Sequence, residues 1–116
     1  MNPLTTTVQH TETGPLLRIA GELDYGSAPE LRRLVTSLAL EPGQRLVLDL
    51  AHLSFCDSSG ITAFIVARNH ATAHQADITL LAVPGPVLRV LRVTGLDQVF
   101  SLAPGPDTRT DRAADG

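Results

Sequence analysis

The sequence contains no lysine and only four aromatic residues, one tyrosine and three phenylalanines. Without lysine, it cannot carry the phosphate-binding loop Gly-x-x-x-x-Gly-Lys-Ser/Thr. The formal net charge is −3 and the arginines form no cluster, so the basic footprint of a nucleic-acid-binding protein is missing. Aromatic side chains on which single-stranded nucleic acid could stack are scarce as well. We therefore expect no nucleic-acid partner.

Cysteine and long apolar runs are also scarce. The single cysteine, Cys56, excludes a disulfide within the chain and is typical of a protein of the reducing cytoplasm. No apolar run reaches the roughly 18 residues that a membrane span requires. The start of the chain lacks the basic and apolar segments of a signal peptide. We expect a cytoplasmic protein with one folded domain and no membrane association.

The apolar pattern predicts alternating strands and helices. A hairpin is expected over 4–10 and 16–20, and a loop over 21–30 leads into a helix that ends near Leu38. Residues 45–51 are almost continuously apolar, which is typical of a strand that is central in a sheet or covered on both faces.

The second half of the chain continues this alternation. We expect a helix from Ser58 to about His74, a buried strand over 77–83, a short helix over 87–93 and a last strand over 98–102. Strand–helix–strand crossings of this length imply parallel pairing, so the fold class is α/β.

Three local patterns predict where elements begin or end. Ser27 and Glu30 have the spacing of a capping box at the start of the first helix. Gly95 is placed as the glycine that ends the late helix. Residues 104–116 offer almost nothing to bury, so we expect a domain over 1–103 followed by a disordered tail over 104–116.

The segment Phe-Cys-Asp-Ser-Ser-Gly-Ile-Thr, residues 55–62, joins an apolar strand to an apolar helix. Asp57 is a typical N-cap residue, and the segment alone leaves open whether it is only a cap or also a site. If Asp57 is the cap, Ser58 occupies the first helical position, where its hydroxyl needs no partner. Gly60 leaves this helix start uncrowded. The free N–H groups and the helix dipole tolerate added negative charge there.

Hydrolytic chemistry fits the segment poorly. A nucleophile elbow requires Gly-x-Ser-x-Gly, followed along the chain by an acid and a histidine. The residues two positions before Ser58 and Ser59 are Cys56 and Asp57. A serine hydrolase is therefore the least favoured function.

Metal binding and thiol chemistry are not favoured either. His70 and His74 are spaced to share a helix face, but no third ligand of suitable spacing follows them, and we expect both on a solvated face. Cys56 is expected to be a small buried residue whose pKa the neighbouring Asp57 raises. We expect no metal and no cofactor.

Residues 46–61, Leu-Val-Leu-Asp-Leu-Ala-His-Leu-Ser-Phe-Cys-Asp-Ser-Ser-Gly-Ile, resemble the core signature of STAS domains, in particular of bacterial anti-sigma factor antagonists. Residues 19–24, 27–31 and 87–100 resemble further pieces of that family in the same order, so the resemblance spans roughly residues 4–102. It implies an α/β fold with a STAS-like mixed β-sheet of four to five strands packed with three to four helices. The family usually closes with an apolar-faced helix, which residues 103–116 do not resemble.

The resemblance implies a protein that is not an enzyme but a regulatory binding partner. The unphosphorylated form would bind an anti-sigma factor, a serine kinase of the histidine-kinase-like ATPase fold, and so free the sigma factor. That kinase would phosphorylate the serine after the loop's aspartate, Ser58, and a PP2C-type phosphatase would reverse the reaction. We expect a monomer or a weak dimer. The implied partner-binding residues are Asp24, Asp57, Ser58, Ser59, Gly60 and Ile61.

Two further expectations follow. The helix after Ser58 is apolar nearly all round over residues 61–67, whereas a helix covered on one side should show a polar face. We expect its extra apolar surface to form a docking patch. The alternative function keeps the fold, as a STAS interaction module of a transport or stress-signalling complex without a phosphorylation switch.

Overall fold

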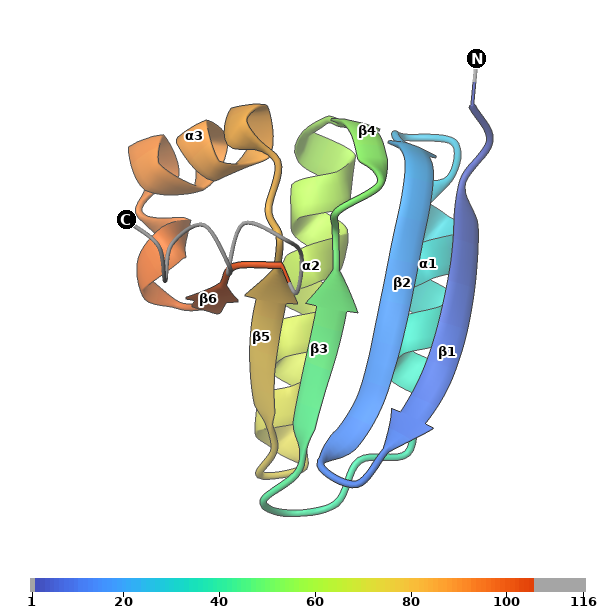
Figure 1. Cartoon of the computed structure of the whole chain (residues 1–116), viewed down its shortest axis with the longest axis vertical. Helices are drawn as coiled ribbons and strands as arrows, with labels where there is room; N and C mark the ends of the chain where they lie inside the picture. The colour runs from blue at the N-terminus through green and yellow to red at the C-terminus, as the bar shows by residue number, and fades with distance from the viewer. Residues whose placement is uncertain (1, 106–116) are drawn as a thin grey trace, which may run out of the picture.

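The computed structural model describes residues 2–105, which form one mixed β-sheet with helices packed against it (Figure 1). The strands run in the order β1-β2-β3-β5-β6, and β4 pairs with β2 outside this path. The β1–β2 pair is antiparallel and all other pairs are parallel. The elements are β1 (Thr5–Thr11), β2 (Gly14–Leu23), α1 (Ala28–Ser37), β3 (Arg45–Asp49), β4 (Leu53–Cys56), α2 (Ser58–Ala73), β5 (Asp77–Leu81), α3 (Gly85–Thr94), a 3₁₀ turn η1 (Leu96–Gln98) and β6 (Ser101–Ala103).

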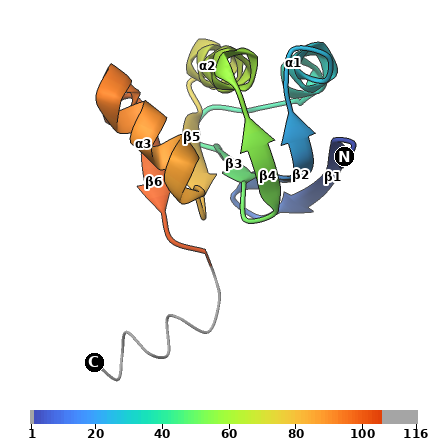
Figure 2. The same ribbon diagram turned by 90° about the horizontal axis from the view of Figure 1, so that it is seen from above.

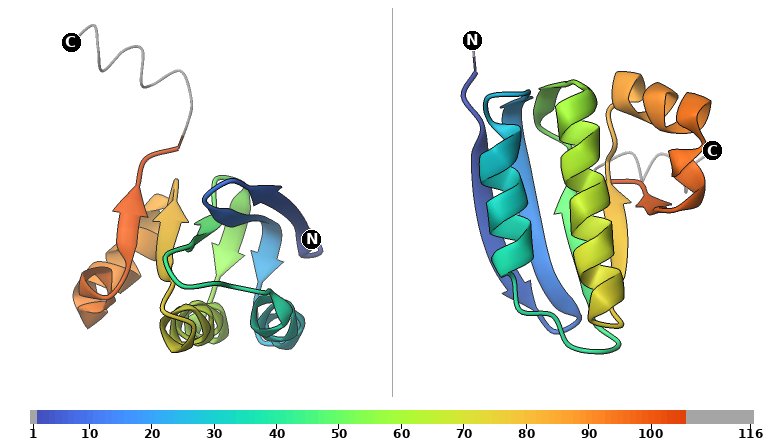
Figure 3. Two further views of the ribbon diagram at one scale, coloured as in Figure 1. Left: turned by 90° about the horizontal axis from the view of Figure 1, so that it is seen from below. Right: turned by 180° about the vertical axis from the view of Figure 1, so that it is seen from behind.

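The hydrophobic core lies between the sheet and the helices α1 and α2, which cover the same face (Figures 2 and 3). Side chains alternate along each strand, so Leu17 and Ile19 of β2 and Leu46 and Leu48 of β3 enter this core and are buried. The predicted α/β class is confirmed. Of the two alternatives for residues 45–51, a central strand is confirmed. The strand β3 lies in the middle of the sheet, but only one of its faces is fully buried.

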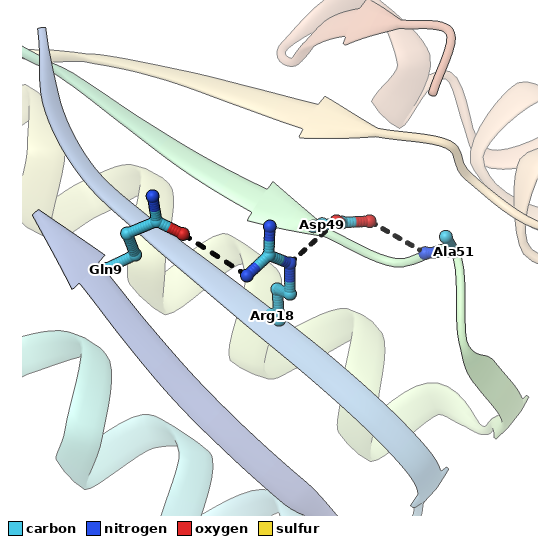
Figure 4. A network of polar contacts seen from close by, with 4 residues as sticks. All are labelled: Gln9, Arg18, Asp49 and Ala51. Carbon is cyan, nitrogen blue, oxygen red and sulfur yellow. Dashed lines mark hydrogen bonds and ion pairs between the residues drawn. The ribbon is translucent and has the colours of Figure 1, made fainter. Parts of the chain in front are cut away.

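The opposite face of the sheet carries polar side chains (Figure 4), and neither α1 nor α2 covers it within residues 2–105 (Figure 2). Arg18 Nε lies 3.6 Å from Asp49 Oδ2, and the Arg18 guanidinium donates to Gln9 Oε1. Asp49 also accepts a hydrogen bond from the Ala51 N–H, which turns the chain at the end of β3. This polar network suits a face that meets water.

One strand was not predicted, and another is longer than expected. The sequence predicts a loop where the short strand β4 lies, because the four residues of β4 form no continuous apolar run. It pairs with the last residues of β2, past a shift in register between Gly21 and Glu22. The strand β2 therefore continues to Leu23, into a segment predicted as loop. The Ser58 segment follows β4 and not β3.

Ser27, Asp57 and Gly95 lie at the helix ends where the sequence predicts them, but the capping hydrogen bonds at α1 do not form. Asp57 caps α2, and Gly95 ends α3 with a left-handed φ of 78°. The capping box at α1 is wrong: Ser27 makes no side-chain cap, because its hydroxyl donates to the Glu22 carbonyl and accepts from the Asp24 N–H. Of the predicted tail, residues 106–116 lie outside the described residues, as does the region of the family's closing helix.

Candidate functional site

Two acidic loops meet at one end of the sheet because β2 and β4 are parallel neighbours. Leu23 lies opposite Cys56 in the register, and the Asp57 N–H donates to the Leu23 carbonyl at 3.2 Å. Asp24 directly follows β2 and Asp57 directly follows β4. The carboxyl ends of parallel strands are where α/β proteins usually place their sites.

Asp57 fixes the start of α2 and leaves Ser58 free. Its Oδ1 accepts hydrogen bonds from the N–H groups of Ser59 at 2.8 Å and Gly60 at 3.2 Å. Ser58 is the first residue of the helix and is exposed, and its hydroxyl has no hydrogen-bond partner among residues 2–105. This geometry presents one hydroxyl to solvent on a helix N-terminus that tolerates negative charge.

Asp24 organises the neighbouring loop. Its Oδ1 accepts hydrogen bonds from the N–H groups of Gly26 at 3.0 Å and Ser27 at 3.1 Å, and it lies 3.2 Å from the Ser27 hydroxyl oxygen. The side chain therefore holds the loop that carries Tyr25, which is 82% exposed. An aromatic side chain so exposed is a common feature of protein-binding surfaces.

Gly60 and Ile61 are placed by the structure beneath the surface, not on it. Both are buried, and Ile61 belongs to the hydrophobic core. A Cβ added to Gly60 would lie 2.6 Å from Cys56 Sγ and 2.8 Å from the Leu23 side chain. Glycine at this position therefore lets the first turn of α2 pack directly against β2 and β4.

Cys56 is part of this packing and not a reactive group. Burial, and secondarily the negative charge of Asp57, raises the pKa of the Cys56 thiol to about 12. The thiol thus stays protonated near neutral pH. A thiolate is the nucleophilic form of cysteine, so this side chain is poorly suited to chemistry.

The predicted docking patch on α2 is wrong. Its apolar side chains are used inside the fold, because α1 packs against one side of α2 and the sheet against another (Figure 3). Phe64 and Ala67 are fully buried, and Ile65 and Val66 are partly buried against the core. A helix enclosed on two sides needs no wide polar face.

Sequence reasoning missed Tyr25 and Arg32, which the structure brings beside the Ser58 segment. A cavity of about 400 Å³ separates the Asp24 loop and α1 from the first turns of α2. We call it the α1–α2 cavity; its lining residues are Tyr25, Gly26, Pro29, Arg32, Ser59 and Thr62. In the sequence, Arg32 looks like any polar residue on a helix surface. Only the packing of α1 against α2 shows that it lines a cavity.

Within residues 2–105, no group of three or more His, Cys, Asp or Glu side chains is arranged to hold a metal ion. His74 is exposed, as predicted, but His70 is not on a solvated face. Its Nε2 lies 2.8 Å from the Leu38 carbonyl oxygen and donates to it at the C-terminal end of α1. None of the helices in this part of the chain is both long and apolar enough to cross a bilayer.

The fold agrees with the comparisons to known proteins. A family model described as the STAS domain matches residues 5–109. The chain belongs to the STAS domain family. It is 28% identical over 87 residues to a STAS-domain containing protein of Pseudomonas aeruginosa, covering 75% of this chain and 85% of that protein. It is 26% identical over 84 residues to an anti-sigma-B factor antagonist of Listeria monocytogenes, covering 72% and 74%.

Solved structures confirm the fold at lower sequence identity. An anti-sigma factor antagonist from Mycobacterium paratuberculosis superposes with a TM-score of 0.76 at 23% identity, covering 97% of this chain and 93% of that one. The anti-sigma factor antagonist SpoIIAA superposes in its unphosphorylated form with a TM-score of 0.64 at 20% identity, covering 96% of each chain. The Bacillus SpoIIAA in the phosphorylated form gives 0.67 at 20% identity, covering 94% and 99%.

Replacing the cap at Asp57 should destabilise the domain moderately. We expect Asp57→Ala to lower the free energy of unfolding by about 0.5–2 kcal/mol, because the Ser59 and Gly60 N–H groups lose their acceptor. Asp57→Asn is the matched control: its side-chain oxygen caps a helix about as well, so its loss should be smaller. Urea unfolding measures both, and equal losses would show that the cap hydrogen bonds do not stabilise α2.

Proposed function

We propose that this chain is an anti-sigma factor antagonist that binds a serine-kinase anti-sigma factor while Ser58 is unmodified and releases it when Ser58 is phosphorylated. The observation that carries the proposal is the exposed Ser58 hydroxyl, which has no hydrogen-bond partner in residues 2–105 and directly follows a cap whose carboxylate accepts two hydrogen bonds. The anti-sigma-B factor antagonists among its relatives support the same role. The chain acts in this role as a substrate and binding partner.

Electrostatics explains why phosphorylation should weaken kinase binding and not strengthen it. A phosphoserine carries about −1.5 to −2 charges at pH 7. At the N-terminus of α2 that charge is favoured by the helix dipole, by about 0.3–1 kcal/mol per charge, so the domain should stay folded. In a close interface the same charge must lose its water, which costs several kcal/mol unless the partner offers a matching group. Phosphorylation therefore acts on the interface and not on the fold.

The acidic residues around Ser58 should further weaken kinase binding by the phosphorylated form. Asp57 lies next to it in the sequence, and Asp24 begins the adjacent loop. A partner that docks here meets a surface that is already acidic before modification, and phosphate adds to the same sign of charge. Two exposed aromatic side chains, Tyr25 and Phe55, lie on the loop and on β4 beside the site and supply apolar contact area.

The assignment is tested by mapping the phosphate. After incubation with the cognate anti-sigma kinase and ATP, we expect mass spectrometry to locate a single phosphate on Ser58. The kinase should select Ser58 over Ser59, because Ser58 is exposed whereas Ser59 is half-buried and lines the α1–α2 cavity. Phosphate on Ser59 alone would refute the Ser58 assignment. No phosphate on either serine, with binding intact, would favour a STAS module without a phosphorylation switch.

A further inference from the structure

The α1–α2 cavity is lined by an arginine, Arg32, that forms no ion pair with any residue from 2 to 105. Arg32 is half-buried on α1, yet none of the carboxylates described in residues 2–105 lies within ion-pair distance of it. The ion pairs in that part of the chain belong to Arg18 with Asp49 and Arg45 with Asp77. The Arg32 side chain therefore lines the cavity with a charge that no carboxylate in residues 2–105 pairs.

The position of the cavity connects Arg32 to the Ser58 surface. Ser59 and Thr62 form one wall, and they lie next to Ser58 and one turn after it on α2. Tyr25 and Gly26 form the opposite wall on the loop that Asp24 holds. A protein that covers Ser58 on this side must therefore also cover the mouth of the cavity.

The acids near the cavity form no ion pair with Arg32 within residues 2–105. The Asp24 oxygen Oδ1 is occupied by its own loop, and the Asp57 oxygen Oδ1 by the start of α2. Glu30 is exposed and two residues before Arg32 on α1, a spacing at which helix side chains do not face each other. The cavity thus offers positive charge inside an otherwise acidic surface.

From this juxtaposition we propose that the α1–α2 cavity receives an aspartate or glutamate side chain of the kinase partner, which pairs with Arg32 while Tyr25 covers the contact. The inference rests on the proposed function and adds to it the chemistry of one contact. Arginine suits this role because its planar guanidinium binds a carboxylate through two parallel hydrogen bonds. Tyrosine and arginine are also the residues most often found to dominate binding energy at protein interfaces.

The pairing with Arg32 explains how the kinase could bind the unmodified protein and reject the phosphorylated one. A carboxylate that enters the cavity is led to Arg32, whereas a phosphate on exposed Ser58 stands outside the cavity. The partner's acid then helps to exclude the phosphorylated protein, because its negative charge would face the phosphate across the interface. Arg32 thus acts as a specificity-determining residue for the unmodified form.

The test compares Arg32→Glu with Arg33→Glu. Arg33 is exposed on the same helix and does not line the cavity, so its variant carries the same change in net charge. We expect Arg32→Glu to weaken binding of the purified cognate kinase by about tenfold or more in calorimetry, and Arg33→Glu by about twofold or less. Arg32→Lys should lose part of the affinity, since it keeps the charge but not the paired hydrogen bonds. Melting curves should be alike for all variants.

A direct readout follows Arg32 itself. In ¹H–¹⁵N spectra, the Nε–H signal of Arg32 should shift when the kinase is added, whereas that of Arg33 should not. Equal weakening by Arg32→Glu and Arg33→Glu would overturn the inference and leave the proposed function standing. An Arg32 signal that shifts on phosphorylation without kinase would overturn it too, because the pairing would then be internal. A wild-type protein that does not bind the kinase would overturn the proposed function and this inference together.

Discussion

Ser58→Ala and Ser58→Asp should melt alike but differ sharply in kinase binding. Ser58→Ala removes only an exposed hydroxyl that has no hydrogen-bond partner in residues 2–105, so it should bind the kinase as tightly as the wild type. It cannot be phosphorylated at this position, so it should hold the kinase permanently. Ser58→Asp places a carboxylate where the partner must dock, and it should bind at least about tenfold more weakly.

The phosphorylated wild type should be weaker still. A penalty of about 3–4 kcal/mol, within the range for an unpaired charge in an interface, corresponds to a factor of several hundred in affinity. The aspartate variant carries about one charge against nearly two for phosphate, so its defect should be smaller. Calorimetric titration of the kinase with the four species ranks them. Equal affinities for the wild type, Ser58→Asp and the phosphorylated form would contradict exclusion by charge.

Gly60→Ala should destabilise the domain strongly for so small a change. The added methyl group would lie 2.6 Å from Cys56 Sγ and 2.8 Å from the Leu23 side chain, so neighbouring atoms must move. Leu23 is fully buried and has little room to adjust. We expect a loss of about 1–3 kcal/mol in the free energy of unfolding, as for overpacking in a tight core. Alanine elsewhere in a helix would favour folding by about 0.5–1 kcal/mol over glycine.

The clash with Cys56 can be separated from other effects. In a Cys56→Ala background the nearest obstacle is gone, so the Gly60→Ala loss should shrink by about 0.5 kcal/mol or more, a coupling typical of residues in contact. Gly85→Ala is the control, because a Cβ there meets nothing within 4 Å. Urea unfolding of the single and double variants gives the coupling. A Gly60→Ala loss that is the same in both backgrounds would show that Cys56 does not restrict this position.

The sequence predicts the features that depend on neighbours along the chain. Asp57 caps α2 through the N–H groups two and three residues later, so its role follows from local residue preferences. Ser27 has an equally good local pattern, yet its side chain does not cap α1. The strand β2 continues past its predicted end, and the Ser27 hydroxyl donates its hydrogen bond to the Glu22 carbonyl instead. That competition depends on pairing between β2 and β4 and is not visible locally.

Features that depend on packing between distant segments are the ones that the sequence did not predict. The apolar surface of α2 predicts a docking patch, whereas α1 and the sheet cover it. The strand β4 was missed because it is short and two of its residues are exposed. Arg32 lines a cavity because α1 packs beside α2, whereas in the sequence it is an ordinary polar residue of a helix surface.

The most direct test of a switch that acts at the interface is hydrogen exchange on the stoichiometrically phosphorylated protein, alongside titration with the kinase. The account predicts that kinase binding is lost, that the melting transition stays cooperative, and that the amide protons of α2 exchange as slowly as in the unmodified protein. Loss of binding together with faster exchange along α2 or a broadened melting transition would contradict it, because phosphate at Ser58 would then act by unfolding the helix that presents it.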